Sequence, residues 1–221
     1  MAITLSTGAT VSVAKTYSPA LGVAAVANTA LSNASECVVT SAGHTLTAGD
    51  YVVISSGWGL LDQRVCRVKS VVAATSFVLE GVDTTDTAKY PIGTGTGTHR
   101  EITVWSQLSQ VKGVSASGGA QQFADITSIT DTVIRQIPTV KDAVNMTIDV
   151  FDDPTLSWYA DVVAADTARS PYGLLMTFPN GSKLVANSYW SIMKVPTMET
   201  NQALMTQISL SYAAEPLRYS T

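Results

Sequence analysis

Histidine, cysteine and paired aspartate are the side chains of this chain that could do chemistry, and they are few. The two histidines, His44 and His99, lie far apart in sequence, and neither has a partner at the spacing of a zinc site. Asp152 and Asp153 could serve as acid and base in glycoside hydrolysis. Capping of a helix that starts at Pro154 is the favoured interpretation of this pair. The sequence therefore predicts no catalytic residue, no metal site and no cofactor.

Three weaker patterns also have structural explanations. Asp83 and Asp86 could contact calcium, but no EF-hand loop surrounds them. The run from Gly93 to Thr98 looks like a glycine-rich phosphate loop, but no Walker lysine and no helix follow it, so we expect a flexible linker. A Ser-His-Asp set could still assemble from distant residues, although no nucleophile-elbow pattern supports one.

The composition favours a folded protein that does not hold nucleic acid by charge. Of the 221 residues, 46% are apolar and 14% are charged, which allows a sizeable core and argues against disorder. The net charge of −4 and the lack of a basic patch argue against binding through phosphate neutralisation. Cys37 and Cys66 are predicted to be buried thiols, and the sequence leaves open whether they pair.

The sequence has neither the pattern of a signal peptide nor that of a membrane-spanning segment. The segment from Met1 to Val13 has no basic start and no long apolar run, so it is not a signal peptide. No run approaches the ~18 apolar residues of a membrane span. We therefore expect a soluble protein made in a reducing cytoplasm.

Residues 28–97 are expected to form a separate small all-β domain. It contains four short runs with strand-like composition, bounded by turn residues. These are Glu36 to Thr40, Tyr51 to Ser55, Arg64 to Val72 and Thr75 to Leu79. Trp58 lies between two glycines, in a turn that could be exposed.

Residues 1–27 and 98–221 are assigned to a second, larger β domain. Strands are expected from Ile102 to Val111 and from Phe123 to Ile129, and a mixed connection from Asp131 to Asp142. Two later strands then alternate strictly, with apolar residues on one face and polar residues on the other. Their polar-face residues are Asn145, Thr147, Asp149, Gln207, Ser209 and Ser211.

A short helix and a tight hairpin separate those two strands. The helix is expected from Pro154 to Ala165, with Leu156, Tyr159, Ala160 and Val163 on its apolar face. Asn180 and Gly181 predict a type I′ hairpin turn, because both residues tolerate positive φ. A strand from Ser182 to Val195 follows the turn.

The order of these features resembles the major tail tube proteins of long, non-contractile-tailed phages, the lambda-like family. The matching features are the strand Met146 to Phe151, a helix carrying Leu156 and Trp158, the turn from Phe178 to Gly181, an outgoing strand through Trp190 and Lys194, and a final strand running into Glu215-Pro216. The run from Ile102 to Thr130 is also similar to this family. Residues 28–97 depart from it and are interpreted as an insertion on the outside of a tube.

The resemblance implies a tail-tube-type β-sandwich or half-barrel that closes into hexameric rings. Stacked rings would form a hollow tube in the virion tail, assembled in the host cytoplasm, through which genomic DNA passes. The implied partners are other copies of the chain, a tape measure protein and tail terminator and initiator proteins. The six polar-face residues are then the candidates for the lumen wall. The connection Thr130 to Asp142 and the N-terminal segment are the candidates for ring-to-ring contacts.

Two other hypotheses stay open at this level. Residues 28–97 could be a virion module that adheres to surfaces or binds carbohydrate through an exposed Trp58. A hydrolase with a site assembled from distant residues, including His44 and His99, is the third hypothesis. The structural hypothesis is preferred because extended β structure with few charges dominates the chain.

Overall fold

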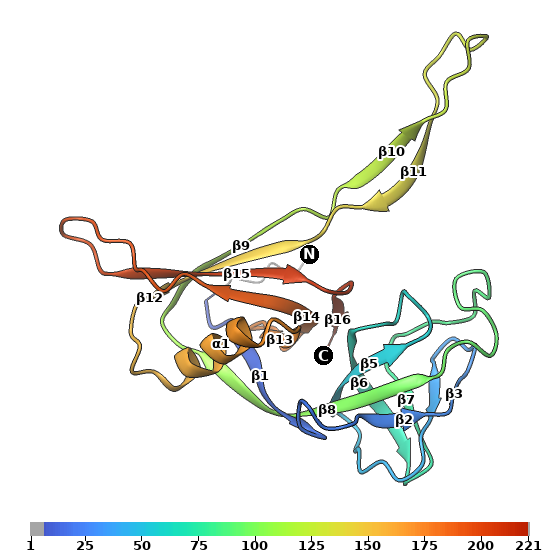
Figure 1. Cartoon of the computed structure of the whole chain (residues 1–221), viewed down its shortest axis with the longest axis horizontal. Helices are drawn as coiled ribbons and strands as arrows, with labels where there is room; N and C mark the ends of the chain where they lie inside the picture. Colours follow the sequence, from blue (N-terminus) through green and yellow to red (C-terminus); the bar gives the residue numbers. More distant parts are fainter. Residues whose placement is uncertain (1–6, 221) are drawn as a thin grey trace.

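Alternating apolar and polar residues fold as antiparallel strands along most of the chain. The computed structural model describes residues 7–220, in which one helix accompanies the strands (Figure 1). The expected mainly β fold class is confirmed. Ile3 and Leu5, which belong to the expected N-terminal strand pattern, lie outside the described residues.

The elements follow one another in short steps. Before the helix come β1 (Thr10–Ser18), β2 (Val26–Asn28), β3 (Ala30–Leu31), β4 (Val38–Thr40), β5 (Tyr51–Ser56), β6 (Arg64–Val72), β7 (Ser76–Leu79), β8 (Gly97–Leu108), β9 (Val111–Ser117), β10 (Gln121–Asp125), β11 (Gln136–Lys141) and β12 (Asn145–Phe151). Then come α1 (Ser157–Ala168), β13 (Tyr172–Thr177), β14 (Lys183–Ile192), β15 (Met205–Tyr212) and β16 (Leu217–Tyr219). Residues 15–35 contain the end of β1 together with β2 and β3.

Most strands belong to one continuous sheet. Its order is β3-β4-β7-β6-β5-β8-β1-β13-β14-β15-β12-β9, while β16 joins β14 and β2 joins β8 from the side. The hairpin β10–β11 forms a separate two-stranded sheet and projects away from the other strands (Figure 1). Because the long sheet bends over itself, its apolar faces pack on each other and on α1.

The larger part of the molecule has its core under α1. Trp158, Val162 and Ala165 of the helix are buried in one cluster with apolar residues of β12, β14 and β15. Val13 and Leu174, from β1 and β13, belong to the same cluster, and the helix lies nearest β14, β8 and β1. Burial of this apolar surface is the main stabilising term for the larger part.

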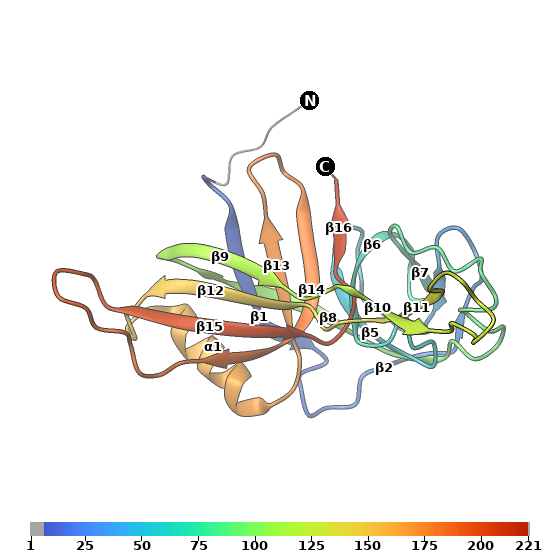
Figure 2. The same ribbon diagram turned by 90° about the horizontal axis from the view of Figure 1, so that it is seen from above.

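Strands β3 to β7 surround a second core of their own. It contains Val39, Ile54, Phe77 and Leu79, each completely buried, together with both cysteines. Figure 2 shows this group of strands beside the larger part, which we call the body. We call residues 28–97 the small unit. The strand β8 runs from the small unit into the body, pairing with β5 and then with β1.

The glycine-rich run that ends the small unit is packed, and the expectation of a flexible linker is wrong. Trp58 is 1% exposed, and its Nε1 donates to the carbonyl of Pro91 at 2.9 Å. Gly95 lies against the Trp58 ring so closely that a Cβ atom would approach ring carbons within 2.7 Å. Gly97 already belongs to β8. The glycines are therefore needed for close packing on a buried tryptophan, which the sequence placed in an exposed turn.

The helix begins three residues later than expected, and neither aspartate caps it. Leu156 occupies the N-cap position without a side-chain hydrogen bond. Asp153 instead accepts hydrogen bonds from the N–H and hydroxyl of Thr155, which lower the pKa of its carboxyl group. Asp152 accepts a hydrogen bond from the Thr206 hydroxyl at 2.7 Å. Such local side-chain bonds compete with helix formation and delay its start.

The buried face of α1 is also rotated relative to the expected one. Trp158, Val162 and Ala165 are the buried residues, while Leu156, Tyr159 and Val163 are only partly buried. Ala160 is exposed. Apolar residues occur on every side of this helix, so their spacing alone did not identify the side that contacts the sheet.

The hairpin between β13 and β14 is present, but its turn is not type I′. Gly181 N–H donates to Phe178 C=O at 2.8 Å, and Phe178 N–H donates to Ser182 C=O at 2.9 Å. Within this turn positive φ occurs at Gly181 alone, at +80°. This is a three-residue loop in which a glycine in the left-handed region follows the turn. Pro179 fills the first loop position, and Asn180 accepts hydrogen bonds from Ser182.

Candidate functional site

The six polar residues proposed for a lumen wall lie on one face of two neighbouring strands. Strand β12 pairs with β15 in a register that places the residues directly opposite one another. The pairs are Asn145 with Ser211, Thr147 with Ser209, and Asp149 with Gln207. Directly opposed residues share a sheet face. The structure therefore brings all six together, while their apolar neighbours point into the core.

The polar face extends onto strands that the sequence did not connect with it. Through its pairing with β12, β9 adds Gly113, Ser115 and Ser117, and through its pairing with β15, β14 adds Tyr189 and Ser191. The result is a row of four hydroxyl residues, Ser115, Thr147, Ser209 and Ser191, across four strands. The alternation from Val114 to Ser117 was the available signal. It was missed because the sequence cannot show that β9 pairs with β12.

The electrostatics of this face are weak. Asp149 is the one charged side chain among its paired positions in the described chain, and Gln207 Nε2 donates to its Oδ1 at 3.2 Å. Lys112, in the bulge of β9, brings its Nζ to 3.3 Å from Met205 Sδ at one end of the same face. Most other positions present exposed hydroxyl and amide groups, so the face offers a phosphate backbone few cationic partners and little counterion release.

The sheet that carries this face has two open edges. Strand β9 is the last strand in the sheet order, so its outer edge is unpaired within the described chain. Strand β14 pairs with β13 only as far as Ser188, and from Tyr189 to Ile192 it pairs with β15 alone. Unpaired backbone groups at a sheet edge are templates for adding a strand from another chain.

An apolar groove lies beside the open edge of β9. It has a volume of about 480 Å³ and is lined by Val11, Val111, Val114, Met176 and Phe178. Val114 is 41% exposed although it lies on the apolar face of the sheet. The core of the body is thus incomplete at the edge where another chain could pair.

The segment after β9 forms a projecting hairpin. Strand β10 ends at Asp125, and β11 occupies much of the region expected to be an irregular connection. Gly118 and Gly119, both at positive φ, stand where the hairpin leaves the sheet. Its exposed apolar residues are Phe123, Ile126, Ile129, Val133, Ile134, Ile137 and Val140. Clustered apolar residues on a projecting element indicate contact with another protein.

A second exposed apolar segment lies at the opposite end of the same sheet. The loop 193–204 connects β14 to β15, whereas the hairpin connects β9 to β12 at the other end (Figure 1). Its exposed residues include Met193, Val195, Met198 and Leu204. Methionine side chains are flexible and adapt to irregular partner surfaces.

The two histidines lie close to a common ring in the core of the small unit. His44 and His99 each pack edge-to-face on Phe77, with ring centroids 5.5 and 5.0 Å away. His99 belongs to β8, and its Nδ1 lies 2.7 Å from Asn28 Oδ1. Burial, with a smaller contribution from His44, lowers the pKa of His99 to about 4.

The other candidate reactive groups lie in structural settings. Within residues 7–220 no three metal-ligating side chains are grouped to hold a metal ion. Asp83 accepts hydrogen bonds from Thr85 in a local turn. Cys37 and Cys66 are free and completely buried, and burial raises their pKa values to about 11 and about 12. A protonated buried thiol is a poor nucleophile.

No helix within residues 7–220 has the length and the apolar character needed to cross a membrane.

Open edges, a one-sided polar sheet and projecting apolar loops define a structural β protein completed by contacts with other chains. The sequence profile of the phage tail tube protein family, TTP, matches residues 56–221. The chain belongs to this family, and its role is that of a structural tail tube protein. The match begins in β5, inside the small unit.

Three solved structures are similar to part of the chain. The tube-terminating cap of the anti-feeding prophage shares 18% identity, with a TM-score of 0.39 over 52% of this chain and 83% of that chain. The baseplate of the same prophage gives 8% identity and a TM-score of 0.39, over 54% and 86% of the two chains. The sheath–tube complex of an extracellular contractile injection system, PVC, shares 14% identity, with a TM-score of 0.37 over 48% of this chain and 80% of that chain. None of the curated proteins compared with the chain matches it.

Proposed function

We propose that this chain is the tube subunit of a long, non-contractile phage tail, of the lambda-like type. Six copies close into a ring, and stacked rings form a hollow tube for the passage of genomic DNA. The observation that carries this proposal is the one-sided sheet β9-β12-β15-β14 in a member of the tail tube family. One face of that sheet is apolar and packed, while the other is polar and uncovered.

Ring closure would pair the two open sheet edges. The outer edge of β9 in one copy and the segment Tyr189 to Ile192 of β14 in its neighbour are the open edges of the four strands that carry the polar face. Joining them would continue the sheet from copy to copy, with its polar face turned toward the axis. The groove beside Val114 would be covered at the same time. A closed ring of sheets removes the edges that make an isolated sheet prone to aggregation.

Ring stacking is assigned to the hairpin β10–β11, which contains most of the predicted connection Thr130 to Asp142. Its apolar residues and those of the loop 193–204 lie at opposite ends of one sheet. Contact between the hairpin of one ring and the loop of the next is a head-to-tail interface, which generates an open filament. The N-terminal segment, the other candidate for this contact, begins with residues 1–6, which lie outside the described part.

The small unit is proposed to be an inserted domain on the outside of the tube. Its separate core and its position beside the body, away from the polar face, support this assignment (Figure 2). The division of the chain into residues 28–97 and residues 1–27 with 98–221 is part of the same proposal. The adhesion hypothesis loses its motivating observation, because Trp58 is buried. Tape measure, terminator and initiator proteins are the proposed partners in the virion tail, and the tail is assembled in the host cytoplasm.

Electron microscopy of the purified full-length chain tests the proposal. With the tail initiator present, we expect long hollow tubes whose cross-section has six-fold symmetry. Image averaging should place the small unit on the outer surface and β12 and β15 at the lumen. Globular particles alone under these conditions would contradict the tube proposal, and tubes of another symmetry would contradict the hexamer.

A further inference from the structure

The small unit and the body are connected along the chain mainly by one long strand. The first half of β8 pairs with β5 of the small unit, and its second half pairs with β1 of the body. A single shared strand would allow the two parts to twist relative to each other. Beside it, β6 lies next to β14, where Asn187 Nδ2 donates to Gln63 Oε1 at 3.4 Å and Lys183 Nζ lies 5.7 Å from the centre of the Tyr51 ring. Contacts of this kind, away from the axis of β8, fix the relative orientation of the two parts.

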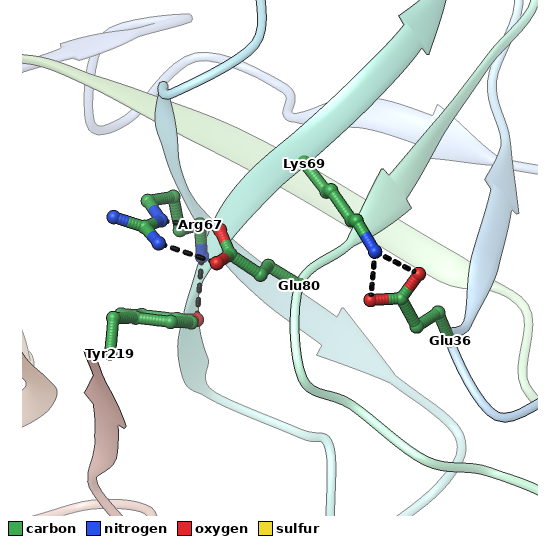
Figure 3. A network of polar contacts seen from close by, with 5 residues as sticks. All are labelled: Glu36, Arg67, Lys69, Glu80 and Tyr219. Atoms are coloured by element: carbon green, nitrogen blue, oxygen red, sulfur yellow. Dashed lines mark hydrogen bonds and ion pairs between the residues drawn. The ribbon is translucent and has the colours of Figure 1, made fainter. Parts of the chain in front are cut away.

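The C-terminal segment provides such a contact. After β15 the chain turns back, and β16 pairs with Lys183 to Val185 of β14 in the body. From this position the side chain of Tyr219 reaches β6 in the small unit (Figure 3). Arg67 N–H donates to the Tyr219 hydroxyl at 2.8 Å, and Tyr219 is only 5% exposed.

The small unit holds Tyr219 on more than one side. The Arg67 guanidinium lies 4.6 Å from the centre of the Tyr219 ring, in cation–π geometry. Glu80, at the end of β7, pairs with the same guanidinium and fixes it in place (Figure 3). Burial raises the pKa of Tyr219, so its hydroxyl stays protonated.

Two further residues of the segment contact the small unit. Leu217 packs against both the core of the small unit and the apolar cluster at the junction, which contains Tyr51 and Val185. Arg64 Nε donates to the carbonyl of Glu215 at 3.2 Å. The segment therefore bonds to the body through its backbone and to β6 through side chains.

We propose that residues 215–219 are a strap that fixes the orientation of the small unit on the body. The strap contributes only three residues to the edge of the large sheet, and none of them belongs to the core of the body. Leu217 and Tyr219 fill the junction between the two parts, so the strap adds a buried attachment to the direct contacts between β6 and β14 and holds the two parts as one rigid subunit. The inference concerns the single chain and does not depend on tube formation.

Distance measurements between spin labels test the strap in the full-length protein. One label is placed at Ile92→Cys in the small unit, where the side chain is 78% exposed, and one at Ala164→Cys on the exposed side of α1. Cys37 and Cys66 are buried and stay unlabelled under native conditions. We expect a narrow distance distribution in the otherwise unchanged chain and a distribution at least twice as wide with Leu217→Ser and Tyr219→Ala combined.

Matched variants keep the test decisive. Tyr189→Ala removes a half-exposed tyrosine from the polar face of β14 and should leave the distribution narrow. Arg67→Met weakens the same contact from the side of the small unit, and it replaces the strap variant if circular dichroism shows that variant to be unfolded. An unchanged narrow distribution in the folded strap variant, or in Arg67→Met when it is the variant used, would overturn the proposal.

Discussion

His99 makes the stability of the small unit sensitive to acid. Its pKa in the folded protein is about 4, against 6.5 in an unfolded chain. As the pH falls the unfolded chain therefore takes up the proton first. The stabilisation is complete above pH 6.5 and is lost progressively down to about pH 4. One pKa unit corresponds to ~1.4 kcal/mol, so we expect a loss of about 3 kcal/mol from this group by pH 4.

The variant His99→Gln isolates this contribution from the carboxylates that titrate in the same range. Urea unfolding of both proteins at intervals from pH 7 to pH 4 gives the free energy of unfolding at each pH. The wild-type curve should fall more steeply than that of His99→Gln, with the difference confined to this window. Parallel curves would show that the burial of His99 between Asn28 and Phe77 does not lower its pKa.

Gly181 is the one position in the β13–β14 turn where a side chain meets backbone strain. Its φ of +80° lies in the region that β-branched residues resist. Gly181→Val should therefore cost about 1–3 kcal/mol of stability and lower the yield of tubes. Gly113→Val is the matched control, because Gly113 has no positive φ and an added Cβ would meet nothing within 4 Å. Thermal melts that coincide for the two variants would show that the turn tolerates valine.

At the scale of elements, local sequence patterns predicted the bounds of strands better than they predicted the start of the helix or the packing of the loops. Arg64 to Val72 was expected as a strand and is β6 with the same bounds. The helix start was misplaced because the side chain of Asp153 bonds locally to Thr155, which a propensity argument does not include. The glycines after Gly93 were assigned to a linker because composition does not reveal that Trp58 packs on them. A local side-chain bond decided the first case, and a tertiary contact decided the second.

The hairpin β10–β11 is the element whose surface is hardest to explain in an isolated chain. Ile129 and Ile134 are 105% and 72% exposed, so aspartate at either position should leave folding unchanged. If the hairpin contacts the next ring, Ile129→Asp combined with Ile134→Asp buries unpaired charge in that interface. We expect tube assembly to fail or to need at least tenfold more protein, measured by sedimentation and electron microscopy.

A matched substitution outside the proposed interface controls for added charge. Ile92 is 78% exposed on the small unit, and Ile92→Asp should assemble normally. Met198→Asp, in the loop at the opposite end of the sheet, should reproduce the hairpin defect if that loop receives the hairpin. Normal tubes from the hairpin variant would remove it from the ring-to-ring contact, and normal tubes from Met198→Asp would remove the loop.

At the scale of the whole molecule, the polar face could be predicted only in part. The strict alternation of β12 and β15 was sufficient to find Asn145 to Asp149 and Gln207 to Ser211 on one face. The sequence could not give their register or show that β9 and β14 flank them, because pairing partners such as Asn145 and Ser211 lie as far as 66 residues apart. The contacts between small unit and body through Tyr219 were likewise beyond local patterns.

The near-absence of charge on this face should matter when DNA moves along it. Ser209 is exposed in the middle of the face, opposite Thr147 and Ser191, and its side chain touches neither core. We therefore expect Ser209→Lys to fold and form tubes. Each ring would then present a circle of ammonium groups to the phosphates, which attract DNA by counterion release. DNA release from virions built with this variant should slow severalfold in a fluorescence assay, and raised salt should restore the rate.

Ser209→Gln separates charge from size, since its side chain also extends into the space but carries no charge. This variant should release DNA at nearly the normal rate at every salt concentration, because it gives phosphates no cation to bind. If the lysine and glutamine variants slow DNA release equally, the width of the lumen and not its charge limits the rate of release. If neither variant changes release while both still form tubes, β15 does not face the path of the DNA, and the orientation proposed for the sheet is wrong.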